Sequence, residues 1–219
     1  MTEISMWAPR GRVRLSRKRL IWIGIVVAAL AALVSGVKVV DINSAAVSGP
    51  EKFSPAAFGR SEFPKVQQAI IKRAVPATTL AAAIAADPTA AGKKYGVDAG
   101  GVGPEISVSF TGVVGRGTDG VYPVKVAGVP KDLLIRIQTG PAITGTDLRD
   151  APGTIAFGQF VNQIDYQNAG AALNDQLKQQ VLSKVDTAHL TGKTVSVVGA
   201  FQLVNPQGWL VTPVQVEVR

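Results

Sequence analysis

Side chains that could bind a small polar ligand gather in one stretch of the chain. A glycine-punctuated loop, Gly140–Ala151, carries hydroxyl, carboxylate and guanidinium groups, and the segment after it combines aromatic rings with amides. This mixture suits a sugar, because polar groups fix the orientation of a ligand while aromatic faces supply contact area. The candidate ligand-binding residues are Thr146, Asp147, Arg149, Asn162 and Gln163.

A structural role is the competing interpretation of the same residues. Arg149 could clamp Asp147 or Asp150 together with the loop backbone, since a guanidinium binds a carboxylate through two parallel hydrogen bonds. Asn162 is a residue type that caps helix N-termini, and the aromatic residues on either side of it could pack into a sheet. Both interpretations stay open on the sequence alone.

Catalytic patterns are sparse in this chain. It has one histidine, His189, and no cysteine, whereas the common hydrolytic mechanisms need a base oriented beside a nucleophile. No Gly-x-Ser-x-Gly turn accompanies His189, so we interpret it as a surface or capping residue. The glycines of residues 100–103 precede a strand, whereas a dinucleotide-binding turn precedes a helix. We expect a protein without enzymatic activity, cofactor or metal, and an envelope hydrolase ranks last.

An uncharged apolar run of 18 residues, Leu20–Val37, follows a segment with six Arg or Lys residues. As a helix the run is about 27 Å long at roughly 1.5 Å per residue, close to the roughly 30 Å core of a bilayer. We predict a transmembrane helix over residues 20–40, with the basic tail 1–19 in the cytoplasm because positive charge stays inside. A cleaved signal peptide and a buried core helix are the alternatives. Residues 41–219 are then periplasmic or otherwise extracytoplasmic.

Most of the net positive charge of the chain lies in the predicted cytoplasmic tail. Of the net charge of +8, residues 1–19 contribute +5 and the remaining residues only +3. The exported part contains no run of basic residues interleaved with aromatic ones, which is the usual footprint of nucleic-acid binding. We therefore exclude nucleic acid as a partner.

The exported part begins with a linker and a helical segment. Residues 41–55 are rich in Ser, Gly, Asn and Pro, a composition typical of linkers. Residues 56–100 are predicted to be helical and to pack on the following domain. Three helices are expected there, starting at Ser61, at Thr78 and at Asp87-Pro88, and ending before Pro76, at Ala86 and at Gly96.

Residues 101–219 predict an OB-fold-like antiparallel barrel in an α+β protein. Alternating apolar residues indicate strands over 106–111, 121–126, 133–137, 194–203 and 209–218. A 3.6-residue pattern indicates a helix over 163–185, and the type of residues 154–160 is left open. The order of three strands, a helix and two strands is that of the OB-fold, and Gly199 would supply the bulge that closes the barrel. A generic antiparallel sheet with one covering helix is the alternative.

Several short motifs together resemble a known family, the predicted bacterial periplasmic lipoproteins called domain of unknown function 2291. The resemblance covers about residues 38–218. The matching motifs are Phe53-Ser54-Pro55-Ala56-Ala57-Phe58, Ile84-Ala85-Ala86-Asp87-Pro88, Gly92-Lys93-Lys94-Tyr95-Gly96, Gly140 to Asp150, Phe160-Val161-Asn162-Gln163-Ile164, Leu173-Asn174-Asp175, Gly192-Lys193-Thr194-Val195 and Thr212-Pro213-Val214.

The resemblance implies an exported, membrane-tethered domain without established activity, often encoded beside sugar ABC transporters. The sequence departs from the family where the lipid would be attached: Val34-Ser35-Gly36 has the form of a lipobox, but Val37 stands where the acylated cysteine is required. We expect a non-catalytic accessory protein whose partners are the inner membrane and ABC transporter subunits. Direct binding of a sugar or similar ligand through the 144–166 region is the alternative.

Overall fold

The computed structural model describes residues 52–219. The predicted cytoplasmic tail, the predicted transmembrane helix 20–40 and most of the predicted linker lie outside this range. Of the helices between residues 52 and 219, none combines the length and the apolar character needed to cross a bilayer.

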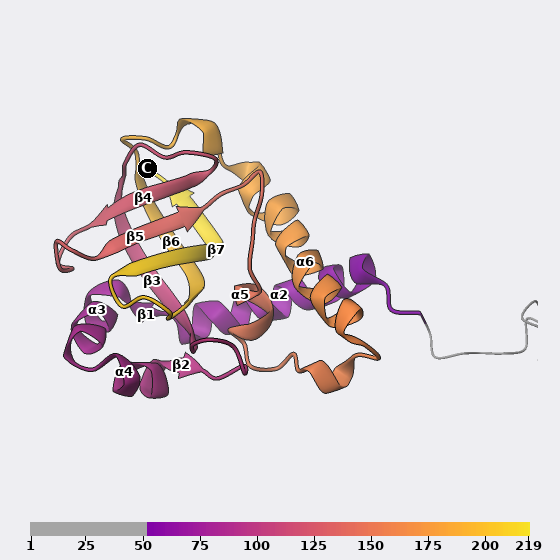
Figure 1. The fold of residues 1–219 in the computed structure, drawn as a ribbon. Coiled ribbons are helices and arrows are strands. Elements are labelled where there is room, and N and C mark those ends of the chain that lie inside the picture. Colours follow the sequence, from indigo (N-terminus) through magenta and orange to yellow (C-terminus); the bar gives the residue numbers. More distant parts are fainter. Residues whose placement is uncertain (1–51) are drawn as a thin grey trace, which may run out of the picture. The chain divides into compact units, whose positions relative to one another are not determined.

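Five strands close into a barrel (Figure 1). They are β3 (Glu105–Val114), β4 (Val121–Val126), β5 (Leu134–Gln138), β6 (Thr194–Gln202) and β7 (Gly208–Val218). The hydrogen-bonded order is β3-β4-β5-β7-β6, and pairing between β3 and β6 closes the ring. Strands β5 and β7 run parallel, while the other barrel pairs are antiparallel. This is the predicted OB-fold-like barrel, and the alternative of a generic antiparallel sheet with one covering helix is wrong.

Two backbone features shape the barrel, a hairpin turn and the predicted bulge at Gly199. Asp119 and Gly120 both have positive φ in the turn between β3 and β4, as expected for a hairpin turn that Asp-Gly favours. The β6–β7 register shifts between Val198 and Gly199, which confirms the predicted bulge. A Cβ at Gly199 would lie 2.5 Å from the carbonyl oxygen of Thr212. Glycine therefore lets β7 approach β6 closely at the bend.

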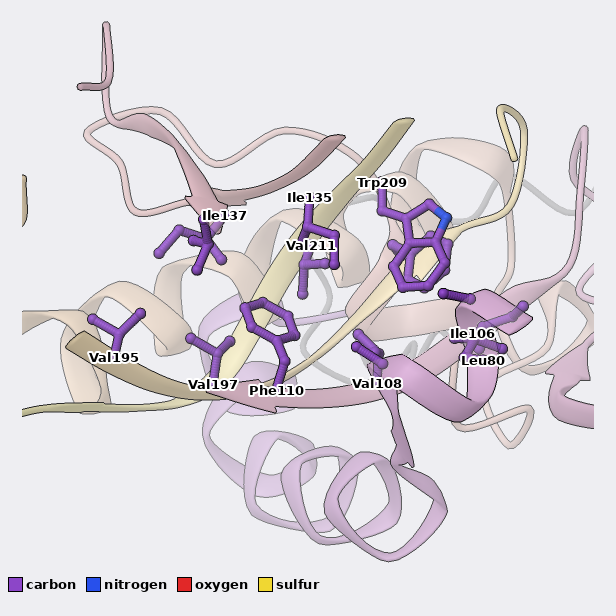
Figure 2. Packing of buried hydrophobic residues seen from close by; sticks show 14 of the residues in the cluster. Leu80, Ile106, Val108, Phe110, Ile135, Ile137, Val195, Val197, Trp209 and Val211 are labelled. Carbon is purple, nitrogen blue, oxygen red and sulfur yellow. The ribbon is translucent and has the colours of Figure 1, made fainter. Parts of the chain in front are cut away.

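The barrel interior is filled by side chains from opposite walls (Figure 2). Ile106, Val108 and Phe110 alternate along β3 and point inward, as the period of two requires. The Trp209 ring lies fully buried and stacks on Phe201 with ring centroids 4.7 Å apart. The interior is therefore a packed core.

Helices α3 (Ala77–Ala86) and α4 (Pro88–Tyr95) belong to this first core, which Leu80, Ile84 and Ala91 join. Short strands β1 (Val75–Pro76) and β2 (Gly96–Val97) flank the two helices and pair with β3. The predicted boundaries of both helices are confirmed within one residue.

The preceding helix, α2 (Pro55–Arg73), starts six residues before the predicted Ser61. The Ser54 side chain accepts a hydrogen bond from the amide of Ala57, and Pro55 occupies the first helical position. This is a standard start signal. Pro64, predicted to lie in the first turn, is instead tolerated inside the helix.

A helical layer made of α2, α5 (Asp147–Asp150) and α6 (Gln163–Gln180) forms a second core. Its side chains pack with Ala200 of β6 and Val214 of β7. α6 ends at Gln180, five residues before the predicted Val185, and a short 3-10 turn, η2 (Leu182–Lys184), follows it. The undetermined segment 154–160 contains the 3-10 turn η1 (Phe157–Gln159).

Candidate functional site

A buried polar cluster lies within this second core. Its members come from separate parts of the sequence: the start of β3, the α5 turn, the first turn of α6 and the middle of β7. The cluster consists of Glu105, Thr146, Asp147, Arg149, Asp150, Tyr166 and Thr212.

Arg149 is the centre of the cluster, and its side chain is 9 % exposed. Its Nε and Nη2 atoms donate to Oδ1 and Oδ2 of Asp150 at 2.7 and 2.9 Å, and Nη1 donates to the Tyr166 carbonyl at 3.2 Å. The guanidinium carbon lies 3.6 Å from the centroid of the Tyr166 ring. This is a bidentate ion pair stacked on an aromatic face, an arrangement that the planar guanidinium favours.

Asp150 and Asp147 are held by separate hydrogen-bond partners. Thr146 Oγ1 donates to Asp150 Oδ2 at 2.6 Å, and the Tyr166 hydroxyl donates to Oδ1 at 3.3 Å. Asp147 instead accepts a hydrogen bond from the Thr212 hydroxyl of β7. Of the two pairings predicted for Arg149, the structure shows the one with Asp150.

Glu105 is the member of the cluster whose burial is not offset by hydrogen bonds. It is 2 % exposed, and neither of its carboxyl oxygens has a hydrogen-bond partner among residues 52–219. Burial raises the pKa of Glu105 to about 8, and the charges of Asp147 and Asp150 act in the same direction, whereas the charge of Arg149 opposes them. Burial likewise raises the pKa of Asp147 to about 6, against the hydrogen bond from Thr212. The site therefore favours a neutral Glu105 at pH 7.

The predicted binding residues divide into two sets. Thr146, Asp147 and Arg149 lie together in the buried polar cluster. Asn162 and Gln163 lie on the exposed start of α6, where Asn162 Oδ1 accepts a hydrogen bond from the Asp165 amide at 2.9 Å and caps the helix. The aromatic residues nearby pack within the helical layer, not into the sheet: Phe160 contacts Phe53, Phe58 and Tyr166. Ligand binding by the five residues stays a prediction.

Two members of the cluster lie outside the predicted binding region 144–166: Glu105 and Thr212. Glu105 carried no local signal of burial, because the alternation of the strand places it on the polar face with Ser107 and Ser109. Tyr166 and Thr212 are far apart in sequence, and only the packing of α6 and β7 brings them to the α5 turn. His189 is exposed and its Nδ1 lies 2.9 Å from Asp186 Oδ2.

A hollow at one end of the barrel is a second candidate for ligand binding. It has a volume of about 590 Å³ and lies among α4, the glycine-rich segment 98–104 and the β6–β7 connection at 203–206. We call it the loop-end hollow. Lys93 and Asp98 line it together with apolar residues including Val102, Leu203 and Val204. Its size falls in the range of small-molecule sites.

The architecture and the comparisons define the class of the protein, an OB-fold domain with an added helical layer. The crystal structure of an OB-fold protein from Thermotoga maritima is similar, with a TM-score of 0.61 and 20 % sequence identity over 76 % of this chain and 99 % of that chain. This similarity shows the fold. No curated protein matches the sequence.

The chain belongs to the family domain of unknown function 2291, described as predicted periplasmic lipoproteins, which matches residues 27–217. The predicted resemblance is thereby confirmed, and the family description agrees with the predicted extracytoplasmic location. The chain nevertheless contains no cysteine for lipid attachment.

Proposed function

We propose that this protein is a non-catalytic accessory protein of a solute transport system, held by residues 20–40 in the inner membrane with the OB-fold domain in the periplasm. The observation that carries the proposal is the match to a periplasmic lipoprotein family in a chain that has an apolar span and no cysteine. A retained helix then takes over the anchoring that a lipid provides in a lipoprotein.

The buried polar cluster supports a non-catalytic role. Arg149, Asp150 and Tyr166 bind one another and hold the α5 turn against α6. Charged groups paired in this way are engaged in structural contacts. A sugar or other solute ABC transporter is the partner that the resemblance implies.

Co-purification tests the transport association. The full chain, extracted in mild detergent from cells expressing a neighbouring importer, should retain the importer subunits, and deletion of the chain should slow solute uptake. The matched control carries the same anchor, residues 1–51, fused to an unrelated exported domain. Unchanged uptake together with no recovered transporter subunit would contradict the proposal.

Direct binding of a small polar ligand is a second candidate, favoured by the loop-end hollow. Lys93 and Asp98 offer opposite charges beside apolar surface there, which suits a polar ligand with a nonpolar face. The 144–166 region remains the alternative location, with Arg149 as its test residue.

Thermal unfolding of residues 41–219 against a library of sugars can separate the two locations, since a ligand stabilises the folded state by mass action. A ligand-induced rise in unfolding temperature that is lost in Lys93→Ala and kept in Arg149→Lys would place the binding site in the loop-end hollow. The reverse result would assign the 144–166 region. A library that leaves the unfolding temperature unchanged at millimolar concentrations would count against this second function.

A further inference from the structure

Exposed apolar side chains concentrate where the chain enters the described domain. Among residues 52–219, eight large apolar side chains are exposed, and three of them fall between residues 157 and 164. These are Phe157, Val161 and Ile164, which are 48 %, 76 % and 68 % exposed. Such a concentration on a small domain commonly marks an interaction surface.

Aromatic contacts tie this surface to the domain entry. The Phe53 ring lies 5.3 Å from that of Phe160, and the Phe157 ring lies 5.6 Å from that of Tyr166. The starts of α2 and α6 consequently lie at the same end of the helical layer (Figure 1). We name the surface formed by Phe53, Phe157, Phe160, Val161 and Ile164 the entry patch.

The length of chain before Lys52 limits the distance between the entry patch and the membrane. Eleven residues, 41–51, separate Val40, the predicted end of the transmembrane helix, from Lys52. Fully extended, they reach at most about 40 Å, and as a flexible coil they span on average about 20 Å. The tether therefore keeps Lys52 within about 40 Å of the predicted end of the membrane helix.

We propose that the entry patch rests on the lipid bilayer, with Val161 and Ile164 inserted at the level of the headgroups and Phe157 beside them. This inference rests on the proposed membrane anchor. Phe and aliphatic side chains on one face bind at this interfacial depth in membrane-surface segments, and exposed Lys52 beside Phe53 supplies a cation for lipid phosphates. A patch bound to lipid would hold the domain in one orientation on the membrane.

Because the chain contains no cysteine, a spin label can be attached to a single introduced cysteine. Val161→Cys, Ile164→Cys and the control Val102→Cys are each introduced into the full chain, labelled with a nitroxide and reconstituted alone in vesicles containing anionic lipid. Val102 is 85 % exposed and lies in the glycine-rich segment 98–104 before β3, so it reports water accessibility away from the patch. Because each replaced side chain is exposed, all three variants should fold.

Flotation of the vesicles is measured first, and collision of the labels with a water-soluble nickel chelate second. The expected result is a chain that floats with the vesicles and labels at 161 and 164 that collide with nickel at least threefold less often than the label at 102. If the chain floats while all three labels collide equally with nickel, the membrane anchor is supported. The proposed contact between the entry patch and the bilayer is then overturned. A chain that does not float overturns both proposals.

Dilution in the bilayer separates lipid contact from self-association. Protection at 161 and 164 that is unchanged over a tenfold decrease in protein per lipid supports contact with lipid. Protection that disappears on dilution assigns the patch to a second copy of the chain and overturns the lipid proposal.

Discussion

Arg149 shows how this domain accommodates a charge in its interior. Its guanidinium has a carboxylate on one edge, a backbone carbonyl on another and an aromatic ring on its face. The desolvation cost of a buried charge is offset only when such partners are in place. The pair with Asp150 also joins the α5 turn to the start of α6, because Tyr166 binds both residues.

Arg149→Ala should lower the free energy of unfolding of residues 41–219 by about 3 to 5 kcal/mol, because it leaves the Asp150 carboxylate buried without its counterion. Urea denaturation followed by circular dichroism measures the change. The matched control is Lys178→Ala, which removes an exposed ion pair with Asp175 and should cost less than about 1 kcal/mol. Equal effects of the two substitutions would refute the interpretation.

The pKa of Glu105 predicts a pH dependence of stability. Because burial raises it from 4.5 to about 8, the folded state keeps a proton that the unfolded chain releases between these values. Stability should therefore fall as the pH rises from about 4.5 to about 8. Asp147, whose pKa burial raises from 3.8 to about 6, contributes in the same direction over its own range.

Glu105→Gln removes the Glu105 part of this dependence by supplying a neutral side chain of the same shape. Relative to the unsubstituted protein, it should gain on the order of a few kcal/mol at pH 8 and little at pH 4.5. Urea midpoints at the two pH values measure the difference, with exposed Glu217→Gln as the control. If Glu105→Gln and the unsubstituted protein lose the same stability between pH 4.5 and pH 8, the result would contradict a protonated Glu105 in the folded state.

Among the elements, the start of α6 contains two of the predicted binding residues, Asn162 and Gln163, and only Asn162 has a structural role there as the helix cap. Asn162→Ala should cost about 1 kcal/mol of unfolding free energy, because the amide of Asp165 loses its capping acceptor. The neighbouring Gln163→Ala should be nearly neutral, since Gln163 is exposed and lies beyond the cap. Chemical denaturation of the two variants measures the difference, and equal costs would contradict the capping role.

The elements themselves were largely predictable, because local signals and the final packing agree. Alternating residues such as Ile106, Val108 and Phe110 face the barrel interior as their period requires, and Gly199 forms the expected bulge. The start of α2 lies before the predicted one because Pro55, and not Pro64, occupies the first helical position. The end of α6 was misplaced because the apolar stripe continues through Val181 and Val185 after the helix has ended.

The candidate site was less predictable, since it is assembled by tertiary packing. Thr146, Asp147 and Arg149 were recognised from one loop, where nearness in sequence places them together. Thr212 reaches Asp147 from β7, across 65 positions of sequence, and no local pattern announces that contact. The burial of Glu105 likewise depends on the α5 turn lying near the outer face of β3.

For the molecule as a whole, the lipobox-like sequence gives a direct prediction. Val37→Cys should convert the chain into a substrate for lipoprotein processing, because it places the missing cysteine directly after Val34-Ser35-Gly36. Intact mass measured on membrane extracts should show loss of residues 1–36 and gain of a lipid. The unsubstituted chain and Val37→Ser should keep their full mass, and an unprocessed Val37→Cys would show that the resemblance to a lipobox is fortuitous.

The two cores also divide the domain mechanically. A pulling force on the chain at Lys52 acts first on Phe53 and α2, which pack against Phe160 and α6. The barrel strands bear that load only after α2 has detached, because each of them is hydrogen-bonded to neighbours on both sides. Tension on the tether would therefore peel α2 from the helical layer and open the second core while the barrel stays closed.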